Sequence, residues 1–432
     1  MKTIVIDPVT RIEGHAKITI HLDDDGRVAD TQFHVTQIRG FEKFCEGRPY
    51  YEMPSITSRI CGICPISHLI ASSKACEAIM SVRVPPTAEK LREIMHLGQV
   101  IQSHALSFFH LSAPDLLLGF DSDPARRNVI GLIEEHPQLA RDGIGLRKFG
   151  QQVIEGLAGE RVHPSWTVPG GVNAALEVAG RDRILAALPQ AKAIALRTLD
   201  LFKGIVDQFA EEIAVFGNAP TMYAGLVNAQ DNLQFYDGHV RFIDAEGGVV
   251  VDRMAAQDYK QYIGEATVPH SFLKAPYFRP QGFPDGIFRV GPLARLNIVA
   301  RCGTEAADIE FAEYHQRFGK VVQSSFHFHY ARLIEIIYCI ERMEVLLNDP
   351  AILDRHVRAH AGVNALEGVG VAEAPRGTLI HHYKVNEDGA IVAVNLIIAT
   401  GNNNLAIGHS ITQVSRHYVD GNRLQDGRLN RV

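Results

Sequence analysis

The chain has few cysteines, a single tryptophan and no long apolar run. Its 432 residues include six cysteines and one tryptophan, and the formal net charge is -6. Without an excess of basic residues it lacks the electrostatic footprint of a nucleic-acid-binding protein, and no uninterrupted apolar run approaches the ~20 residues of a membrane span. Residues 1–8 turn polar too soon for a signal peptide, so we expect a cytoplasmic protein unless a partner's signal exports it.

The cysteine pattern excludes a secreted disulfide framework. Four cysteines stand alone, and we interpret them as small buried hydrophobic residues: Cys45, Cys76, Cys302 and Cys339. The other two form a Cys-x-x-Cys pair, Cys61-Gly-Ile-Cys64. No second pair of this kind is present in the sequence to complete a four-cysteine zinc site.

Pro65 and His68 define the surroundings of this pair. Proline fits the first position of a helix, where its missing N–H would have no partner, so we expect a helix to begin at Pro65 with Cys64 at its N-terminus. The helix dipole and the free N–H groups there favour a thiolate at Cys64. His68 follows one turn later on the same face and can reach the sulfur or a bound group.

The residues alone leave three interpretations of the pair open. A zinc site needs two further ligands at matched spacing. A dithiol redox site would normally follow a strand in a small βαβ unit, whereas the residues after Pro65 are helical in composition. The third interpretation is a site for a softer metal that is completed by residues elsewhere in the protein.

The apolar patterns predict a mainly α (α+β) fold, with a central bundle of long helices and small peripheral antiparallel sheets. Apolar residues three and four apart predict long helices in residues 85–111, 181–217 and 304–348. Asp-Gly pairs between alternating apolar runs predict hairpins around Gly26 and Gly389.

Residues 234–252 are predicted to form a further small β element, and residues 277–296 a loop. No repeat or clean linker divides the chain, so we expect one integrated domain over residues 1–432. Its predicted parts are a small N-terminal sheet in residues 1–45, a helical core in 55–350 and a C-terminal hairpin in 370–400.

Five motifs resemble those of the large subunit of [NiFe] hydrogenases, and they occur in the family's order. They are Arg11-Ile-Glu-Gly-His15, Arg39-Gly-Phe-Glu42, Arg59-Ile-Cys-Gly-Ile-Cys64 with His68, His163-Pro through Val168-Pro-Gly-Gly171, and Ala374-Pro-Arg-Gly377. The resemblance covers nearly the whole chain. It is greatest to the large subunit of cytoplasmic, bidirectional, NAD-reducing hydrogenases.

The resemblance implies a Ni–Fe centre, with carbon monoxide and cyanide on the iron, held between four cysteine sulfurs. Cys61 matches a terminal nickel ligand and Cys64 a sulfur that bridges nickel and iron, and thiolates are soft ligands suited to nickel. Glu13 matches the proton-relay carboxylate. Glu42 matches a magnesium ligand, a hard oxygen donor for a hard cation.

Three further residues receive roles from the same resemblance. Arg376 matches a guanidinium that lies over the metals, and Asp115 is expected to be its carboxylate partner. His68 would lie beside the bridging sulfur and orient it.

The sequence departs from the family pattern at its C-terminus. The family supplies its other two cysteines from a second Cys-x-x-Cys near the C-terminus, followed by a histidine, and this sequence has neither before Val432. We expect that tail to lie beyond residue 432, because a metal-free descendant should have lost Cys61 and Cys64 as well.

The resemblance predicts the catalytic subunit of a hydrogenase that cleaves H2 heterolytically and reversibly. The chain has no Rossmann glycine fingerprint and too few clustered cysteines for an iron–sulfur cluster, so electrons must leave through partners. The implied partners are flavin-containing diaphorase subunits that carry FMN, iron–sulfur clusters and NAD, together with an iron–sulfur small subunit. The alternatives are a metal-free scaffold or quinone-site subunit, as in respiratory complexes, and a zinc or dithiol protein.

Overall fold

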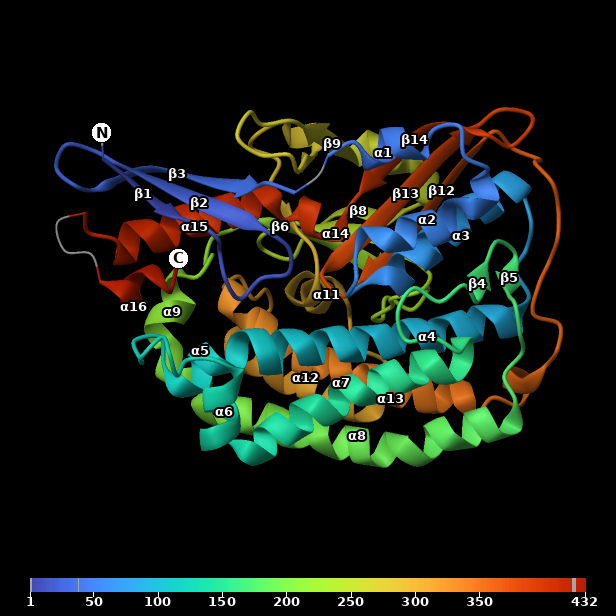
Figure 1. The fold of residues 1–432 in the computed structure, drawn as a ribbon, viewed down its shortest axis with the longest axis horizontal. Helices are drawn as coiled ribbons and strands as arrows, with labels where there is room; N and C mark the ends of the chain where they lie inside the picture. The colour runs from blue at the N-terminus through green and yellow to red at the C-terminus, as the bar shows by residue number, and fades with distance from the viewer. Residues whose placement is uncertain (1, 38, 422–424) are drawn as a thin grey trace.

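Four long helices form a bundle along one side of the molecule. The structure is a computed structural model that describes residues 2–37, 39–421 and 425–432. Helices α4 (Pro86–Ala105), α7 (Pro137–Ala158), α8 (Val178–Ile205) and α13 (Phe328–Leu347) lie side by side in the lower half of Figure 1. Each contributes fully buried apolar residues to one core, for example Ile101, Leu146, Leu199 and Ile337. The predicted central helical bundle is therefore confirmed.

The helix predicted over residues 304–348 is in fact two helices. Helix α12 (Glu305–Phe318) ends at Gly319, whose φ of 96° lies in the left-handed region that favours glycine. The chain then turns back before α13 begins. In the same way α8 is followed by a short helix, α9 (Ala210–Val215). The apolar pattern continues through both breaks, so spacing alone did not reveal them.

Helix α4 does not stop where its α-helical hydrogen bonding ends. It passes into a π-helical segment, Leu106–Ser112, and then into α5 (Ala113–Leu118). A π-helix contains more residues in each turn than an α-helix and often marks a functional site. The result is one nearly continuous helical rod that carries Asp115 close to its C-terminal end.

Two three-stranded antiparallel sheets lie above the bundle (Figure 1). The first contains β1 (Lys2–Ile6), β2 (Ala16–Leu22) and β3 (Val28–Val35), and the second contains β12 (Glu367–Ala374), β13 (Gly377–Val385) and β14 (Ile391–Ile397). The hairpins predicted around Gly26 and Gly389 are both confirmed. Strand β12 was not predicted, so the C-terminal hairpin is in fact a three-stranded unit.

A four-stranded sheet completes the upper layer. In order across the sheet, it contains β11 (Phe288–Arg289), β6 (Met222–Val227), β7 (His239–Ile243) and β8 (Val249–Met254). The predicted β element in residues 234–252 is the β7–β8 hairpin. Residues 277–296 were wrongly predicted to be loop throughout. Strand β11 lies there and forms only by pairing, in parallel, with the distant strand β6, and a helix begins at Pro292.

Among the remaining elements, two helices matter for the site. These two are α3 (Pro65–Met80) and α11 (Pro292–Ile298). The others are α1 (Phe41–Cys45), α2 (Met53–Thr57), α6 (Val129–Glu135), α10 (Tyr259–Tyr262), α14 (Ala399–Asn402), α15 (Asn404–Tyr418), α16 (Asp426–Leu429), β4 (Thr167–Val168), β5 (Gly171–Val172), β9 (Ile263–Ala266) and β10 (Ala275–Phe278).

Two glycines let β12 pack directly against α3. A Cβ added at Gly368 would lie 2.1 Å from the carbonyl oxygen of Ala75, and one at Gly370 would lie 1.9 Å from that of Ala71. The contact moves back along the helix as the strand advances, so strand and helix run antiparallel. The turn after β12, which carries Arg376, is thereby brought to the N-terminal end of α3, where Cys64 lies.

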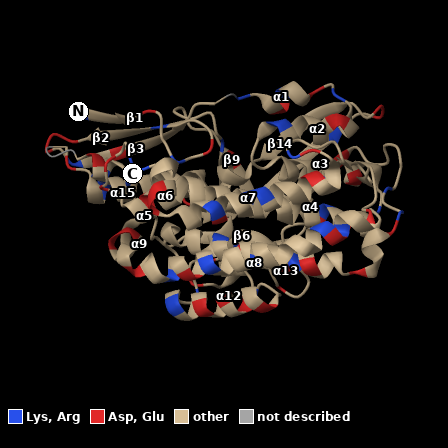
Figure 2. Cartoon of the chain, turned by 60° about the horizontal axis from the view of Figure 1, so that its bottom comes forward, with Lys and Arg blue, Asp and Glu red and all other residues tan. Residues whose placement is uncertain are grey.

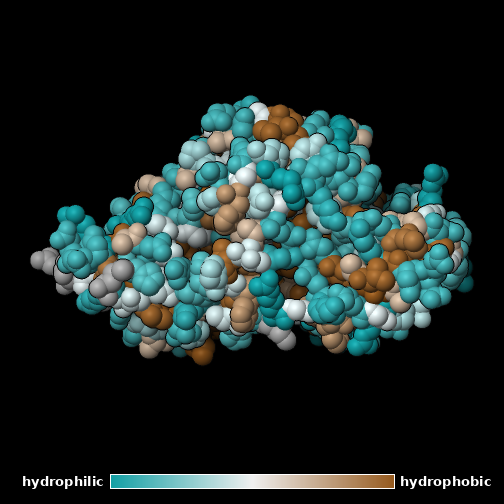
Figure 3. Space-filling model, turned by 90° about the horizontal axis from the view of Figure 1, so that it is seen from above, coloured by the Kyte–Doolittle hydropathy of each residue, from teal (hydrophilic) through white to brown (hydrophobic). Residues whose placement is uncertain are grey.

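The surface carries charge of both signs. Figure 2 shows basic and acidic residues interspersed along the helices, with no continuous basic face in that view. Figure 3 shows a mainly hydrophilic surface with small hydrophobic patches. Within the described ranges, no helix is both long enough and apolar enough to cross a membrane.

Candidate metal centre

The two cysteines of the Cys-x-x-Cys pair lie together at the start of α3. The helix begins at Pro65, as predicted, and Cys64 is its N-cap residue. The Sγ atoms of Cys61 and Cys64 are 2.6 Å apart, and the backbone N–H of Cys64 donates to Sγ of Cys61 at 3.2 Å. Cys64 is buried and Cys61 is half-buried. The geometry presents two adjacent sulfurs to one side of the helix N-terminus.

The two thiols differ in acidity because they share a hydrogen bond. The S–H group of Cys64 donates to Cys61 and, together with Arg376 and the backbone N–H groups, lowers the pKa of Cys61 to about 6 although burial opposes it. The same hydrogen bond and burial raise the pKa of Cys64. The thiolate therefore lies on Cys61. The prediction that the helix terminus would favour a thiolate at Cys64 was wrong, since the hydrogen bond between the sulfurs outweighs the helix dipole.

Arg376 lies over the sulfur pair. Its Nη1 is 3.7 Å from Sγ of Cys64. Burial opposes its charge, but the sulfurs of Cys64 and Cys61 and the carboxylate of Glu13 outweigh burial and raise the pKa of Arg376. The structure thus brings Arg376 and the cysteines together, and Glu13 lies close enough to interact electrostatically with Arg376. Glu13 itself is exposed, in the segment between β1 and β2.

The predicted pair between Asp115 and Arg376 is not formed. Asp115 instead bridges two other guanidinium groups, Nε of Arg11 at 3.2 Å and Nε of Arg127 at 2.9 Å. Arg11 also donates to the carbonyl of Arg127. Both carboxylate oxygens of Asp115 are therefore occupied. Through Arg11, Asp115 connects the segment that carries Glu13 to the C-terminal end of the α4–α5 rod.

His68 lies on the same face of α3 as Cys64, one turn along. It is buried, and burial together with Arg376 lowers the pKa of His68 to about 3, so the ring is neutral. Its Nδ1 atom lies 3.0 Å from Nε2 of His381 on β13. Sequence reasoning missed His381, because no local pattern relates two residues 313 positions apart.

Glu42 belongs to a neighbouring polar cluster. Its Oε1 accepts hydrogen bonds from Nζ of Lys274 and from the backbone N–H of Leu396, each at 2.9 Å. The same ammonium group is 2.6 Å from Glu265 and 2.8 Å from Oδ1 of Asn395. A cavity of about 160 Å³ is lined both by Glu42 and by the residue before Cys61. The oxygens suit a hard cation, and in this structure the lysine ammonium provides the positive charge.

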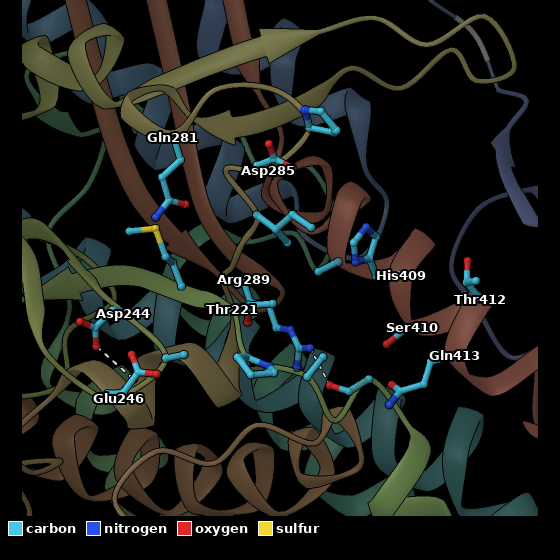
Figure 4. Close-up of a pocket in the computed structure, with 18 of the residues that line it drawn as sticks. Thr221, Asp244, Glu246, Gln281, Asp285, Arg289, His409, Ser410, Thr412 and Gln413 are labelled. Carbon is cyan, nitrogen blue, oxygen red and sulfur yellow. Dashed lines mark hydrogen bonds between the residues drawn. The ribbon is translucent and has the colours of Figure 1, made fainter. Parts of the chain in front are cut away.

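A larger cavity of about 950 Å³ lies between the four-stranded sheet and α15 (Figure 4). Its lining includes Arg289, Asp244 and Glu246 from the sheet and its turns, and His409 and Gln413 from α15. Neither cysteine of the pair lines it. This cavity is therefore separate from the sulfur pair.

Two adjacent sulfurs, one of them a thiolate, are donors that suit a soft metal ion. The described part of the chain contains no group of three or more His, Cys, Asp or Glu residues placed to hold a metal. The four other cysteines are buried elsewhere as free thiols, in line with their interpretation as hydrophobic residues. A zinc site complete within the described residues is thus not present, and the pair alone offers two sulfur donors.

Sulfur donors beneath a guanidinium, on a helical bundle with small sheets, are compatible with a protein that holds a soft-metal centre. A family model described as nickel-dependent hydrogenase matches residues 39–120 and 221–405, more than half of the chain, and one described as HoxL-like matches residues 3–38. The chain belongs to the nickel-dependent hydrogenase family, as the large subunit, and is an oxidoreductase.

Individual relatives agree with this assignment. The chain is 41% identical to a component of the vhu F420-non-reducing hydrogenase of Methanocaldococcus jannaschii, over 96% of this chain and 99% of that protein. It is 38% identical to the NAD-reducing hydrogenase HoxS subunit beta of Cupriavidus necator, over 100% of this chain and 91% of that protein. A crystal structure of an H2-reduced NAD+-reducing [NiFe]-hydrogenase matches with a TM-score of 0.97 and 43% identity, over 100% of this chain and 96% of that one.

Proposed function

We propose that the chain is the catalytic large subunit of a [NiFe] hydrogenase that cleaves H2 reversibly and delivers electrons toward NAD. The observation that carries the proposal is the adjacent Cys61–Cys64 pair beneath Arg376. A Ni–Fe centre with carbon monoxide and cyanide on its iron would supply the redox chemistry and the polarisation of H2. Two sulfurs are half of the four that the family resemblance implies, so the holoenzyme needs two sulfur donors beyond these.

The chain's own residues have distinct tasks in this proposal. Cys61, the more accessible of the two sulfurs, would offer a sulfur base that can hold a proton. Glu13, exposed at the edge of the site, would carry that proton to the surface. Arg376 holds a fixed positive charge against the sulfurs, where it stabilises negative charge. His68 would fix the orientation of the sulfur end of α3 through its neutral ring.

We further propose that magnesium binds at the oxygen cluster of Glu42, Glu265 and Asn395. These side chains are the hard oxygen donors that magnesium prefers. Lys274 neutralises the same carboxylates in this structure. Magnesium and the ammonium group of Lys274 would therefore compete for, or share, the negative charge of this cluster.

Partners follow from the electron path. We propose an iron–sulfur small subunit next to the Cys61–Cys64 site and diaphorase subunits with FMN and iron–sulfur clusters that reduce NAD, all in the cytoplasm. The name of the Cupriavidus necator relative supports NAD as acceptor, whereas the Methanocaldococcus jannaschii relative is named for not reducing F420. The acceptor is therefore tested separately from hydrogen uptake.

Metal analysis and hydrogen-dependent dye reduction of the purified complex test the proposal. We expect nickel and iron in the wild type, and loss of both nickel and activity in Cys64→Ser. Cys76→Ser is the matched control, because Cys76 is also a buried cysteine of α3 but its S–H donates to the carbonyl of Tyr50. Wild-type complex without nickel and without hydrogen uptake would contradict the proposal. That result would favour the alternative of a metal-free scaffold subunit. The similarity to hydrogenase subunits does not favour this alternative.

A further inference from the structure

Arg295 is a fully buried arginine in α11 with every N–H group bonded. Nε and Nη2 donate to the two oxygens of Glu335 at 2.7 and 2.8 Å, and Nη1 donates to Glu373 at 2.8 Å. The two remaining N–H groups donate to the carbonyls of Ala374 and Pro375, each at 3.0 Å. Such a planar fork fixes its acceptors in position as well as in distance.

The two carbonyls belong to the residues immediately before Arg376. Glu373, at the other side of the same guanidinium, also accepts from Thr378 Oγ1 at 2.6 Å and from the backbone N–H of Leu226 at 3.1 Å. The turn between β12 and β13 is therefore held from both ends. Arg295 joins it to α13 through Glu335, and Glu373 joins it to β6.

The backbone of Arg376 also touches the start of α11. Gly291, whose φ is 100°, precedes the helix, and a Cβ added there would lie 2.7 Å from the carbonyl oxygen of Arg376. This close approach needs a glycine. The turn is thus pressed against the same helix that carries Arg295.

The side chain of Arg376 has no carboxylate partner of this kind. Its Nη1 donates to Sγ of Cys64 at 3.7 Å, Glu13 is a more distant neighbour of opposite charge, and within the described ranges no carboxylate forms an ion pair with it. A hydrogen bond to sulfur is long and weak, so the position of the guanidinium depends largely on its backbone. The place of the guanidinium over Cys64 therefore depends on the turn.

We propose that Arg295, with Glu335 and Glu373, is a positioning residue that holds the β12–β13 turn so that the Arg376 guanidinium lies over Cys64. The inference rests on the proposed function for its catalytic meaning, but not for its geometry. Lysine at position 295 would keep the charge and lose the fork, so the carbonyls of Ala374 and Pro375 would lose their donors.

Arg92 provides a matched control. It is also fully buried, and it donates to Glu77 at 2.6 Å and to the carbonyls of Val168 and Gly171. Arg92→Lys therefore removes a comparable buried fork, but one that holds the β4–β5 loop. Loss of general stability should be similar in Arg92→Lys and Arg295→Lys, whereas a change at Arg376 should be specific to Arg295.

The experiment uses the purified complex and two readouts. The rate of backbone amide hydrogen–deuterium exchange in the peptide covering residues 371–380 should increase in Arg295→Lys and stay unchanged in Arg92→Lys. A crystal structure of Arg295→Lys should show the Arg376 guanidinium displaced from Cys64. If the variant does not fold, Glu335→Gln, which keeps size and one acceptor, replaces it. Unchanged exchange and an unmoved guanidinium would overturn the inference.

Hydrogen-dependent dye reduction adds a double-mutant test. A displacement on the order of 1 Å can reduce a rate by about 100-fold, so Arg295→Lys should lose at least about tenfold. If Arg295 acts through Arg376, the double variant Arg295→Lys/Arg376→Lys should lose no more than Arg376→Lys alone. Additive losses would overturn the inference. Absence of hydrogen uptake in the wild-type complex would instead contradict the proposed function. Amide hydrogen–deuterium exchange and the crystal structure of the variant would still test the role of Arg295.

Discussion

The Nδ1 atom of His68 faces Nε2 of His381, and both rings are buried and neutral. Burial holds the pKa of each well below its usual value. Tyr383 O–H donates to Ser72 at 2.8 Å and lies 2.6 Å from Nδ1 of His381. Because that hydroxyl donates to Ser72, its oxygen accepts a hydrogen bond from Nδ1–H of His381. Nε2 of His381 then accepts from Nδ1–H of His68. Nε2 of His68 is then left unprotonated and can act only as an acceptor.

Removing the Tyr383 hydroxyl should therefore destabilise the protein. Tyr383→Phe leaves a buried ring nitrogen of His381 without its partner, and we expect the free energy of unfolding to fall by roughly 1–3 kcal/mol. Urea denaturation measures it. The control is Tyr314→Phe, since the buried hydroxyl of Tyr314 has no hydrogen-bond partner among the described residues. Equal effects of the two substitutions would contradict the hydrogen-bonded chain.

The free energy of unfolding should fall as the pH falls below about 6.5. Burial lowers the pKa of His96 and His329 to about 3 and that of His104 and His327 to about 4, so in the folded state these rings stay neutral. Between those values and 6.5 the unfolded chain binds more protons, and stability is lost as pH falls. Each histidine contributes up to about 1.4 kcal/mol per pH unit.

Urea titrations at several pH values measure this slope. His329→Phe should make the slope shallower, because it removes one such proton-binding site from the unfolded state. His136→Phe is the control, since that side chain is only partly buried. A pH-independent unfolding free energy between 6.5 and 4 would contradict the prediction.

Cys61 should be the most reactive cysteine before metal is added. Its pKa of about 6 makes it a thiolate at pH 7, whereas burial raises the pKa of Cys76, Cys302 and Cys339. Alkylation with iodoacetamide, followed by peptide mass spectrometry, should show a fast phase at Cys61 with a midpoint near pH 6. Cys61→Ser should abolish the fast phase, and uniform labelling of all cysteines would contradict it.

Lys274 and magnesium should substitute for one another. Lys274→Met leaves Glu42 and Glu265 without their counter-charge, and we expect the melting temperature to fall. Millimolar magnesium should restore more stability to this variant than to the wild type. The double variant Glu42→Gln/Lys274→Met should gain less from magnesium. Equal responses in all three proteins would show that magnesium does not bind at this cluster.

The sequence was informative wherever the cause is local. Pro65 marked the start of α3, and the Asp-Gly pairs marked the two hairpins, because a missing N–H and a positive φ act on the residue itself. Local patterns could not show that Gly319 ends a helix inside an unbroken apolar pattern.

The partners of the site residues were beyond the reach of local patterns. Asp115 was assigned to Arg376 by resemblance, and its guanidinium partners proved to be Arg11 and Arg127. No sequence motif indicated Lys274, which neutralises Glu42. None indicated Arg295, which holds the turn that carries Arg376. Each acts across a long sequence separation that only the packing of strands against helices resolves. Gly368 and Gly370, two residues apart on β12, allow the close packing of that strand against α3.

The π-helical segment between Leu106 and Ser112 makes this part of the chain sensitive to length. An α-helix turns by about 100° per residue, and this segment already holds more residues per turn than an α-helix, so one further residue inserted here would rotate everything after it by up to about that angle. Asp115 would then point away from Arg11 and Arg127. Natural variation in residues 106–112 should therefore consist of substitutions, with insertions rare.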